Sequence, residues 1–263
     1  MAGKKVWLTW MPGGEGAPQP QDTVATLGRY GLEASGAQWT DDLEKVAWAE
    51  LGGVLLDRAN ADLWVLAGRR GDLESPRNRY ALSLVTAMVR DGRGGDLRGV
   101  CLGLDFAPEA AGMPFLLRSF QLLDGRDGGW PAALVAAAYG APAPAVHDFR
   151  LNVIAHSLVG QWFEVGPREG EWQGVMLGAS AEGTITHHAV GPRGQLPEKA
   201  VLEYPVQGIE AQIGADKFLA WAVQNRLGPE DSYYVRIEGY PTKLIFGGHP
   251  GTDQAEVVVL DLV

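Results

Sequence analysis

The stretch ADLWVLAG, residues 61–68, is the feature that most restricts how this chain can fold. Its apolar run shows no alternation with polar residues, which is typical of a strand covered on both faces in a parallel sheet. A charged loop, RRGDLESPRNR, follows directly. Within it, Ser75 and Pro76 suit the N-cap and first residue of a helix whose buried stripe includes Tyr80 and Leu84. The stretch therefore predicts a buried strand that leads through a loop into a helix.

Similar alternation of strands and helices extends over the first 140 residues. Because this pattern is typical of parallel sheets with right-handed crossovers, we expect an α/β domain over residues 1–140. The proline-rich segment APAPA, residues 141–145, is the predicted linker to a second domain, residues 146–263. The expected strands are 5–10, 32–39, 61–68, 98–105 and 115–123, and the expected helices are 23–30, 40–59, 75–90 and 131–139.

The second half has a different character, with short apolar runs separated by Gly/Pro turns. One helix is predicted at residues 215–227, with Phe218 and Val223 among its buried residues and Gly228-Pro229 at its end. We therefore expect an α+β domain with a mainly antiparallel sheet. The expected strands are 149–165, 172–177, 183–190, 233–238, 242–246 and 256–262.

Composition excludes several classes of function. The net charge of −10 argues against a general nucleic-acid binder, because neutralising phosphates needs a basic face. Because the chain has a single cysteine, Cys101, a Cys-based zinc site is excluded and a reducing cytoplasm is the expected compartment. Cys101 lies in an apolar run and is expected in the core. The first apolar run stops at Met11-Pro12, too early for a signal peptide, and we expect no membrane span.

Four segments of the first half resemble a TIR-like domain, which has a flavodoxin-like fold. They are the strand KKVWLTW, the helix ending in LLDRA, the strand ADLWVLAG and the Ser-led helix SPRNRYALSLV, and the resemblance covers about residues 4–141. TIR enzymes that cleave NAD carry a glutamate three residues after the aromatic residue of this helix. Tyr80 matches the aromatic residue, which places Ser83 at the glutamate position. The resemblance therefore implies a domain that acts by binding and assembly, and we expect no catalytic residue.

The charged loop is the candidate binding site, for an anion or a nucleotide. It follows the carboxyl end of a parallel strand, where open α/β sheets bind ligands, and it leads into a helix N-terminus, which attracts anions. The alternative is a solvated loop whose charges are matched by Asp72 and Glu74. The candidate residues are Arg69, Arg70, Ser75, Arg77 and Arg79.

Other chemical motifs are incomplete. The five histidines lack metal-ligand spacing, and His187 and His188 should point to opposite faces of a strand, so no metal site is expected. An acid–base pair of His188 with Glu203 or His156 stays open. Ser180 in GASAEG lacks the spacing of a nucleophile turn, and the loop MPGGEGAPQPQ lacks a phosphate-binding pattern. The tryptophans Trp162, Trp172 and Trp221 are interpreted as core anchors.

These observations favour a non-catalytic signalling or assembly protein that acts through protein partners or self-association. A place in bacterial defence follows only from the TIR resemblance. A nucleotide- or NAD-binding sensor or hydrolase that uses the arginine-rich loop is the first alternative. A structural oligomer subunit is the second, because unpaired edge strands recruit partners. No cofactor is expected.

Overall fold

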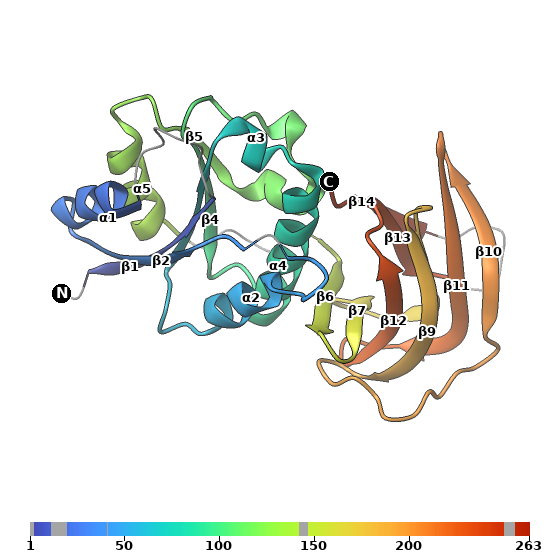
Figure 1. Cartoon of the computed structure of the whole chain (residues 1–263). Helices are drawn as coiled ribbons and strands as arrows, with labels where there is room; N and C mark the ends of the chain where they lie inside the picture. The colour runs from blue at the N-terminus through green and yellow to red at the C-terminus, as the bar shows by residue number, and fades with distance from the viewer. Residues whose placement is uncertain (1–2, 12–19, 41, 142–146, 250–255) are drawn as a thin grey trace. The chain divides into compact units, whose positions relative to one another are not determined.

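The computed structural model describes residues 3–11, 20–40, 42–141, 147–249 and 256–263. The chain divides into two compact units, residues 1–145 and 146–263. Figure 1 shows the elements of both units. The predicted linker, 141–145, and the Gly/Pro-rich loop after the first strand fall almost wholly outside the described residues.

The first unit is built on a parallel five-stranded sheet, as predicted. Its strand order is β2-β1-β3-β4-β5, which is the order of flavodoxin-like folds. In the middle strand, β3, all six residues are buried, as expected for the apolar stretch at 61–68. The strands are β1 (Lys4–Trp10), β2 (Leu32–Gln38), β3 (Leu63–Gly68), β4 (Arg98–Gly103) and β5 (Gln121–Asp124).

Helices cover both faces of this sheet. Helices α1 (Pro20–Arg29) and α5 (Trp130–Tyr139) lie on one face, and α2 (Trp48–Leu56) and α4 (Pro76–Arg93) lie on the other (Figure 1). On the first face, Leu27 and Leu134 of the helices join one buried apolar cluster with Val6, Leu8 and Val65 of the strands.

The opposite face of the sheet buries aromatic side chains. There the Trp64 indole Nε1 donates to Thr9 Oγ1 at 2.9 Å, and the ring meets Phe120 edge-on, with centroids 5.3 Å apart. Burial on both faces explains why β3 lacks polar alternation.

Two element boundaries in this unit differ from the prediction. The helix expected from residue 40 begins at Trp48, because Val46 adopts a left-handed φ of 57° that a helix cannot contain. Asp42 still accepts a backbone hydrogen bond, from Lys45 N, and it caps a turn there instead of the helix. The strand expected at 115–123 is a 3-10 helix, η2 (Phe115–Ser119), followed by β5. Two further short helices are α3 (Arg70–Leu73) and η1 (Ala110–Gly112).

The second unit is a sandwich of two antiparallel sheets, which confirms the antiparallel prediction. The four-stranded sheet has the order β6-β7-β12-β9, and the five-stranded sheet has the order β10-β11-β8-β13-β14. Aromatic contacts join the two inner faces: Phe149 meets Phe246 with centroids 5.0 Å apart, and His188 meets Trp221 at 4.8 Å. The strands are β6 (Phe149–His156), β7 (Gly160–Pro167), β8 (Trp172–Ala179), β9 (Gly183–Pro192), β10 (Val206–Ile213), β11 (Asp216–Leu227), β12 (Asp231–Gly239), β13 (Lys243–Gly248) and β14 (Glu256–Asp261).

The helix predicted at 215–227 is wrong, because these residues form strand β11. This strand has apolar residues on both faces, with Trp221 and Val223 turned toward the four-stranded sheet and Phe218 and Ala222 turned away from it. The resulting unbroken apolar run has no period that separates a strand from a helix. Pairing with β8 and β10 then outweighs the helix propensity of its Ala and Leu residues.

Two further predictions change in this unit. The single strand expected at 149–165 is a hairpin, β6 and β7, with Gly160 at a left-handed φ of 75°. Strand β10 was not predicted, although its residues from Ile209 to Ile213 alternate between apolar and polar as those of a half-buried strand do. Among the described residues, no helix is long and apolar enough to cross a membrane.

Candidate functional site

The loop after β3 is hydrogen-bonded to the loop after the neighbouring strand β4, at the carboxyl ends of both strands. Arg70 N donates to Asp105 Oδ1 at 2.9 Å, so the start of α3 is fixed to the loop that follows β4. The Arg70 guanidinium pairs with Glu74 at 2.9 Å and lies over the ring of Phe106, 4.5 Å from its centroid. Arg79, one turn into α4, donates from Nε to Leu73 O at 3.2 Å. These contacts hold α3 against the start of α4.

A small pocket lies between these groups, with a volume of about 120 Å³. Its position, beside the carboxyl ends of β3 and β4, is where ligands bind in open α/β sheets. Both walls carry charged and apolar groups. The lining residues are Arg70, Leu73, Glu74, Arg79, Phe106, Ala107, Glu109, Gly112 and Met113.

The structure brings together only part of the predicted set. Arg70 and Arg79 line the pocket, whereas Arg69, Ser75 and Arg77 do not. Ser75 is the N-cap of α4, as predicted, but its side chain makes no capping hydrogen bond. Arg69 is the N-cap of α3, and Arg77 is exposed. Of the five predicted residues, only Arg70 and Arg79 therefore share this pocket.

Sequence reasoning missed the opposite wall of the pocket. Phe106, Glu109 and Met113 belong to the segment after β4, more than 25 residues beyond the arginine-rich loop. The signal was available, because adjacent parallel strands place their carboxyl-end loops side by side. The loop after the next predicted strand was therefore the place to look for partners.

The position suggested by the TIR resemblance lies in the core. Ser83 is fully buried within α4, and Tyr80 is only 1% exposed. Neither residue lines the pocket, where the acidic groups are Glu74 and Glu109. The site therefore has a different location from the one that the resemblance implies.

Most other arginines of the first unit bond to backbone carbonyls. Arg93 is buried and donates to Leu55 O and Ala61 O, both at 2.9 Å. Arg98 donates to Ala137 O at 2.8 Å in the same way. Such arginines satisfy carbonyls at the ends of helices and strands, and their role is structural.

The candidate groups of the second unit also have structural partners. His188 Nδ1 lies 2.8 Å from the Tyr233 hydroxyl between the two sheets, and burial lowers the pKa of this histidine. The acid–base pairing with Glu203 or His156 is not formed: His156 is exposed and accepts a bond from Leu158 N, while Glu203 lies beside Asn225. His187, as predicted, points to the opposite face and is exposed.

Ser180 and Cys101 are likewise engaged or buried. Ser180 Oγ donates to Glu182 Oε2 at 2.7 Å within the turn between β8 and β9, and it accepts the N–H of Thr242 at 2.9 Å, which ties this turn to the start of β13. Cys101 is 2% exposed, and burial raises the pKa of its thiol to about 12, so it is a core residue as predicted. Across the described segments, no group of His, Cys, Asp and Glu side chains could hold a metal ion.

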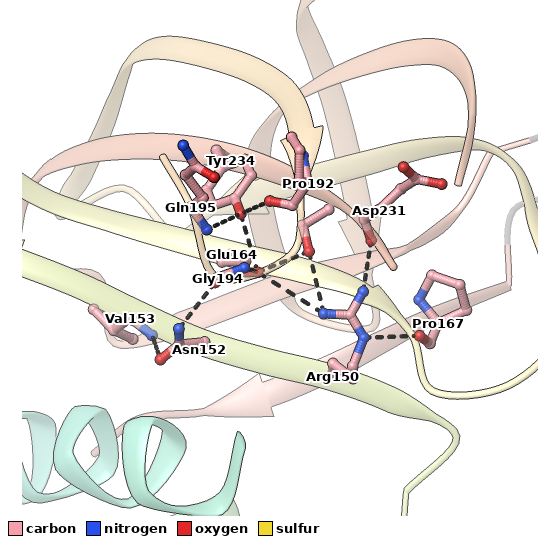
Figure 2. A network of polar contacts seen from close by, with 11 residues as sticks. Arg150, Asn152, Val153, Glu164, Pro167, Pro192, Gly194, Gln195, Asp231 and Tyr234 are labelled. Carbon is pink, nitrogen blue, oxygen red and sulfur yellow. Dashed lines mark hydrogen bonds and ion pairs between the residues drawn. The ribbon is translucent and has the colours of Figure 1, made fainter. Parts of the chain in front are cut away.

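The most buried charges form a network on the outer face of the four-stranded sheet (Figure 2). Arg150 and Glu164 are 2% and 1% exposed, with a nitrogen and an oxygen 3.8 Å apart. Glu164 accepts bonds from Ser232 Oγ at 2.8 Å and from Gly194 N at 2.7 Å. Since Gly194 belongs to the loop that follows β9, the network fastens this loop onto the sheet.

Arg150 is satisfied on its other side by backbone groups. Its Nε donates to Pro167 O at 3.0 Å, and its Nη2 donates to Asp231 O at 2.5 Å (Figure 2). Asn152 adds a bond to Glu164 at 2.9 Å. With its donors and acceptors paired inside the protein, the network stabilises the sheet and leaves no group directed at a ligand.

Comparison with protein-family models, with curated proteins and with solved structures gives no match to this chain.

Proposed function

We propose that this protein is a non-catalytic assembly protein whose copies associate through one edge of the five-stranded antiparallel sheet in the second unit. The edge consists of residues 201–213, which comprise β10 and the segment before it, and we name it the β10 edge. In the described residues, β10 pairs with β11 on one side only. The preceding segment continues along β11, where Gln224 N donates to Glu203 O at 2.7 Å. Such an edge leaves a row of backbone groups available to another chain.

Exposed apolar side chains along this edge carry the proposal. Val201 is 64% exposed, Tyr204 80% and Val206 46%, and all three lie within six consecutive residues. Scattered exposed apolar residues are ordinary, but a run of them on an unpaired edge favours contact with another protein.

The β10 edge is regular enough for pairing over part of its length. A bulge interrupts its register between Val206 and Ile209, and bulges discourage pairing where they occur. From Ile209 to Ile213 the strand is regular, and alternate residues extend an apolar cluster on the outer face of the sheet. Those residues would add apolar contact to the main-chain hydrogen bonds of a paired strand.

The non-catalytic part of the proposal is supported by the burial and the hydrogen bonds of the side chains that could act as nucleophiles, acids or bases. Cys101 is buried, while Ser180, His188 and Glu164 are engaged in the contacts described above. A nucleotide sensor is less well supported, because a pocket of about 120 Å³ is smaller than the roughly 300–1,000 Å³ of typical ligand sites. A role in bacterial defence would rest on the TIR resemblance alone.

Sedimentation velocity over a range of protein concentrations tests this proposal. We expect concentration-dependent association, and we expect the double variant Tyr204→Lys/Val206→Lys to remain monomeric, because charged lysines on an edge oppose pairing. Leu158→Lys is the matched control, since Leu158 is 86% exposed at the turn between β6 and β7, away from the edge. A monomer at every concentration, or equal association of the two variants, would contradict the proposal.

A further inference from the structure

The pocket beside β3 and β4 contains two charges that its own residues leave unpaired. Arg70 and Glu74 neutralise each other at 2.9 Å. Within the described residues, the Arg79 side chain makes one hydrogen bond, from Nε to Leu73 O, so its terminal nitrogens have no protein acceptor there. The Glu109 side chain is exposed and has no hydrogen bond or ion pair with the described part of the chain. The pocket thus offers one cationic and one anionic group to a ligand.

The terminal nitrogens of Arg79 are directed into the pocket. Arg79 Nη2 lies 3.8 Å from the point that a Cβ on Gly112 would occupy, and Gly112 is part of the lining. The absence of a side chain at this position keeps the guanidinium accessible. The apolar residues of the lining are Leu73, Phe106, Ala107 and Met113.

These features select the chemistry of the ligand. A simple anion would be attracted by Arg79 but repelled by Glu109, while the paired charges of Arg70 and Glu74 largely cancel, so Glu109 counts against phosphate or a nucleotide. A molecule with both charges can satisfy Arg79 through its carboxylate and Glu109 through its ammonium group. A volume of about 120 Å³ restricts that molecule to a small one.

We propose that this pocket binds a small zwitterion of the size of a free amino acid, with its carboxylate on Arg79, its ammonium on Glu109 and its apolar part against Leu73 and Met113. This inference goes beyond assembly through the β10 edge and does not depend on it. Binding at the carboxyl ends of β3 and β4 would make the first unit a receptor for a metabolite-sized ligand.

Isothermal titration of the full chain tests the proposal with three kinds of probe. The first is the set of free proteinogenic amino acids, together with β-alanine and γ-aminobutyrate. The second consists of the N-acetyl and the amide derivatives of the best binder, each of which lacks one charge. The third is inorganic phosphate. We expect one or more free amino acids to bind, and each single-charge derivative to bind at least about tenfold more weakly, because a charge-assisted hydrogen bond is lost.

Variants locate the binding in the pocket. Arg79→Gln and Glu109→Gln should each weaken binding at least about tenfold. Gly112→Leu should weaken binding by filling the pocket while both charges remain. Arg29→Gln and Glu50→Gln are controls on the surfaces of α1 and α2, and they should bind as the parent chain does. Because Glu109 is exposed, its variant should fold even if loss of the Arg79 contact to Leu73 O disturbs the structure.

Three results would overturn the inference. The first is no binding of any free amino acid at about 10 mM, a concentration that would reveal even very weak sites. The second is equal binding of phosphate or of an N-acetyl derivative, which would identify a simple anion site. The third is binding that survives Gly112→Leu and Glu109→Gln. The Tyr204→Lys/Val206→Lys variant should bind the amino acid normally, so failure of the assembly proposal and failure of this one are distinguishable.

Discussion

The pocket cluster of the first unit and the Arg150–Glu164 network of the second contain the same kinds of group in opposite surroundings. In the pocket, the side chains of Arg70 and Glu74 are 59% and 41% exposed. In the network, the side chains of Arg150 and Glu164 are 2% and 0% exposed. Both clusters contain an arginine–glutamate pair, so the type of residue does not distinguish a site that can bind from one that holds the fold together.

The difference lies in how the remaining hydrogen-bonding capacity is satisfied. Burial removes water from Glu164, so several protein donors must replace it, among them Ser232 and Gly194. Arg79 is partly exposed and Glu109 is exposed, so water can satisfy both groups, and they keep hydrogen-bonding capacity that a ligand can take. A network whose members are paired within the protein contributes stability, and a cluster partly satisfied by water contributes recognition. Four variants test how burial decides the contribution of a polar group, two of them in these clusters and two at the His188–Tyr233 pair, which is buried between the sheets of the second unit.

The largest effect is expected from Glu164→Ala. The variant leaves Arg150 buried without its carboxylate and removes the acceptor for Ser232 and Gly194, so the free energy of unfolding should fall by about 3–5 kcal/mol. Urea unfolding followed by circular dichroism measures the loss. A decrease below about 1 kcal/mol would show that water reaches the network, and the network would then not differ from the exposed pocket cluster in its contribution to stability.

The next largest effect is expected from Tyr233→Phe, which removes one hydroxyl from the core of the sandwich. His188 Nδ1 would lose its partner at 2.8 Å while the aromatic packing remains. An unsatisfied buried polar group costs about 1–3 kcal/mol, and the same urea measurement should report a loss in that range. The matched control is Tyr139→Phe at an exposed tyrosine, which should change stability by less than about 0.5 kcal/mol.

A smaller effect should appear in the pH dependence of stability. Burial lowers the pKa of His188 in the folded chain, so the unfolded chain binds its proton first as the pH falls. The contribution of His188 is complete above the unfolded pKa of about 6.5 and declines as the pH falls toward the folded value. His188→Gln should therefore reduce the slope of unfolding free energy between about pH 7 and pH 5. The exposed neighbour His187 provides the control variant, and equal slopes in both variants would exclude this role.

The smallest effect is expected from Glu74→Gln in the pocket. Its pair with Arg70 is exposed, so the variant should lose less than about 1 kcal/mol of stability. Thermal unfolding by calorimetry is sufficient to measure it. A loss as large as that of Glu164→Ala would mean that the pocket cluster holds the fold together, and the two regions would no longer differ.

The parallel sheet was predictable because its signals are local. The apolar run of β3, the N-cap Ser75 with Pro76, and the glycine stop at Gly31 each appear within a few residues of sequence. Strand β11 was not predictable in the same way. Its two apolar faces are both covered by other strands or side chains, so the deciding contacts lie far away in the sequence.

The sites were less predictable than the fold for a related reason. The arginine-rich loop was identified, but the sequence could not show that Arg70 is neutralised by Glu74 or that Glu109 lies on the facing wall. Arg150 and Glu164 gave no signal at all, since an alternating strand predicts that such residues are exposed. The loop that covers them comes from after β9, and only the folded chain brings it there.

The buried network also affects the order in which the chain can fold. Arg150 and its hydroxyl partner Ser232 are 82 residues apart in the sequence, and they meet at 3.1 Å. During synthesis, β6 and β7 can pair early as a local hairpin, yet both charges would stay hydrated until β12 emerges from the ribosome. The second unit should therefore acquire its native state in one late, cooperative step. Chains released before that point would expose the β6–β7 hairpin to aggregation.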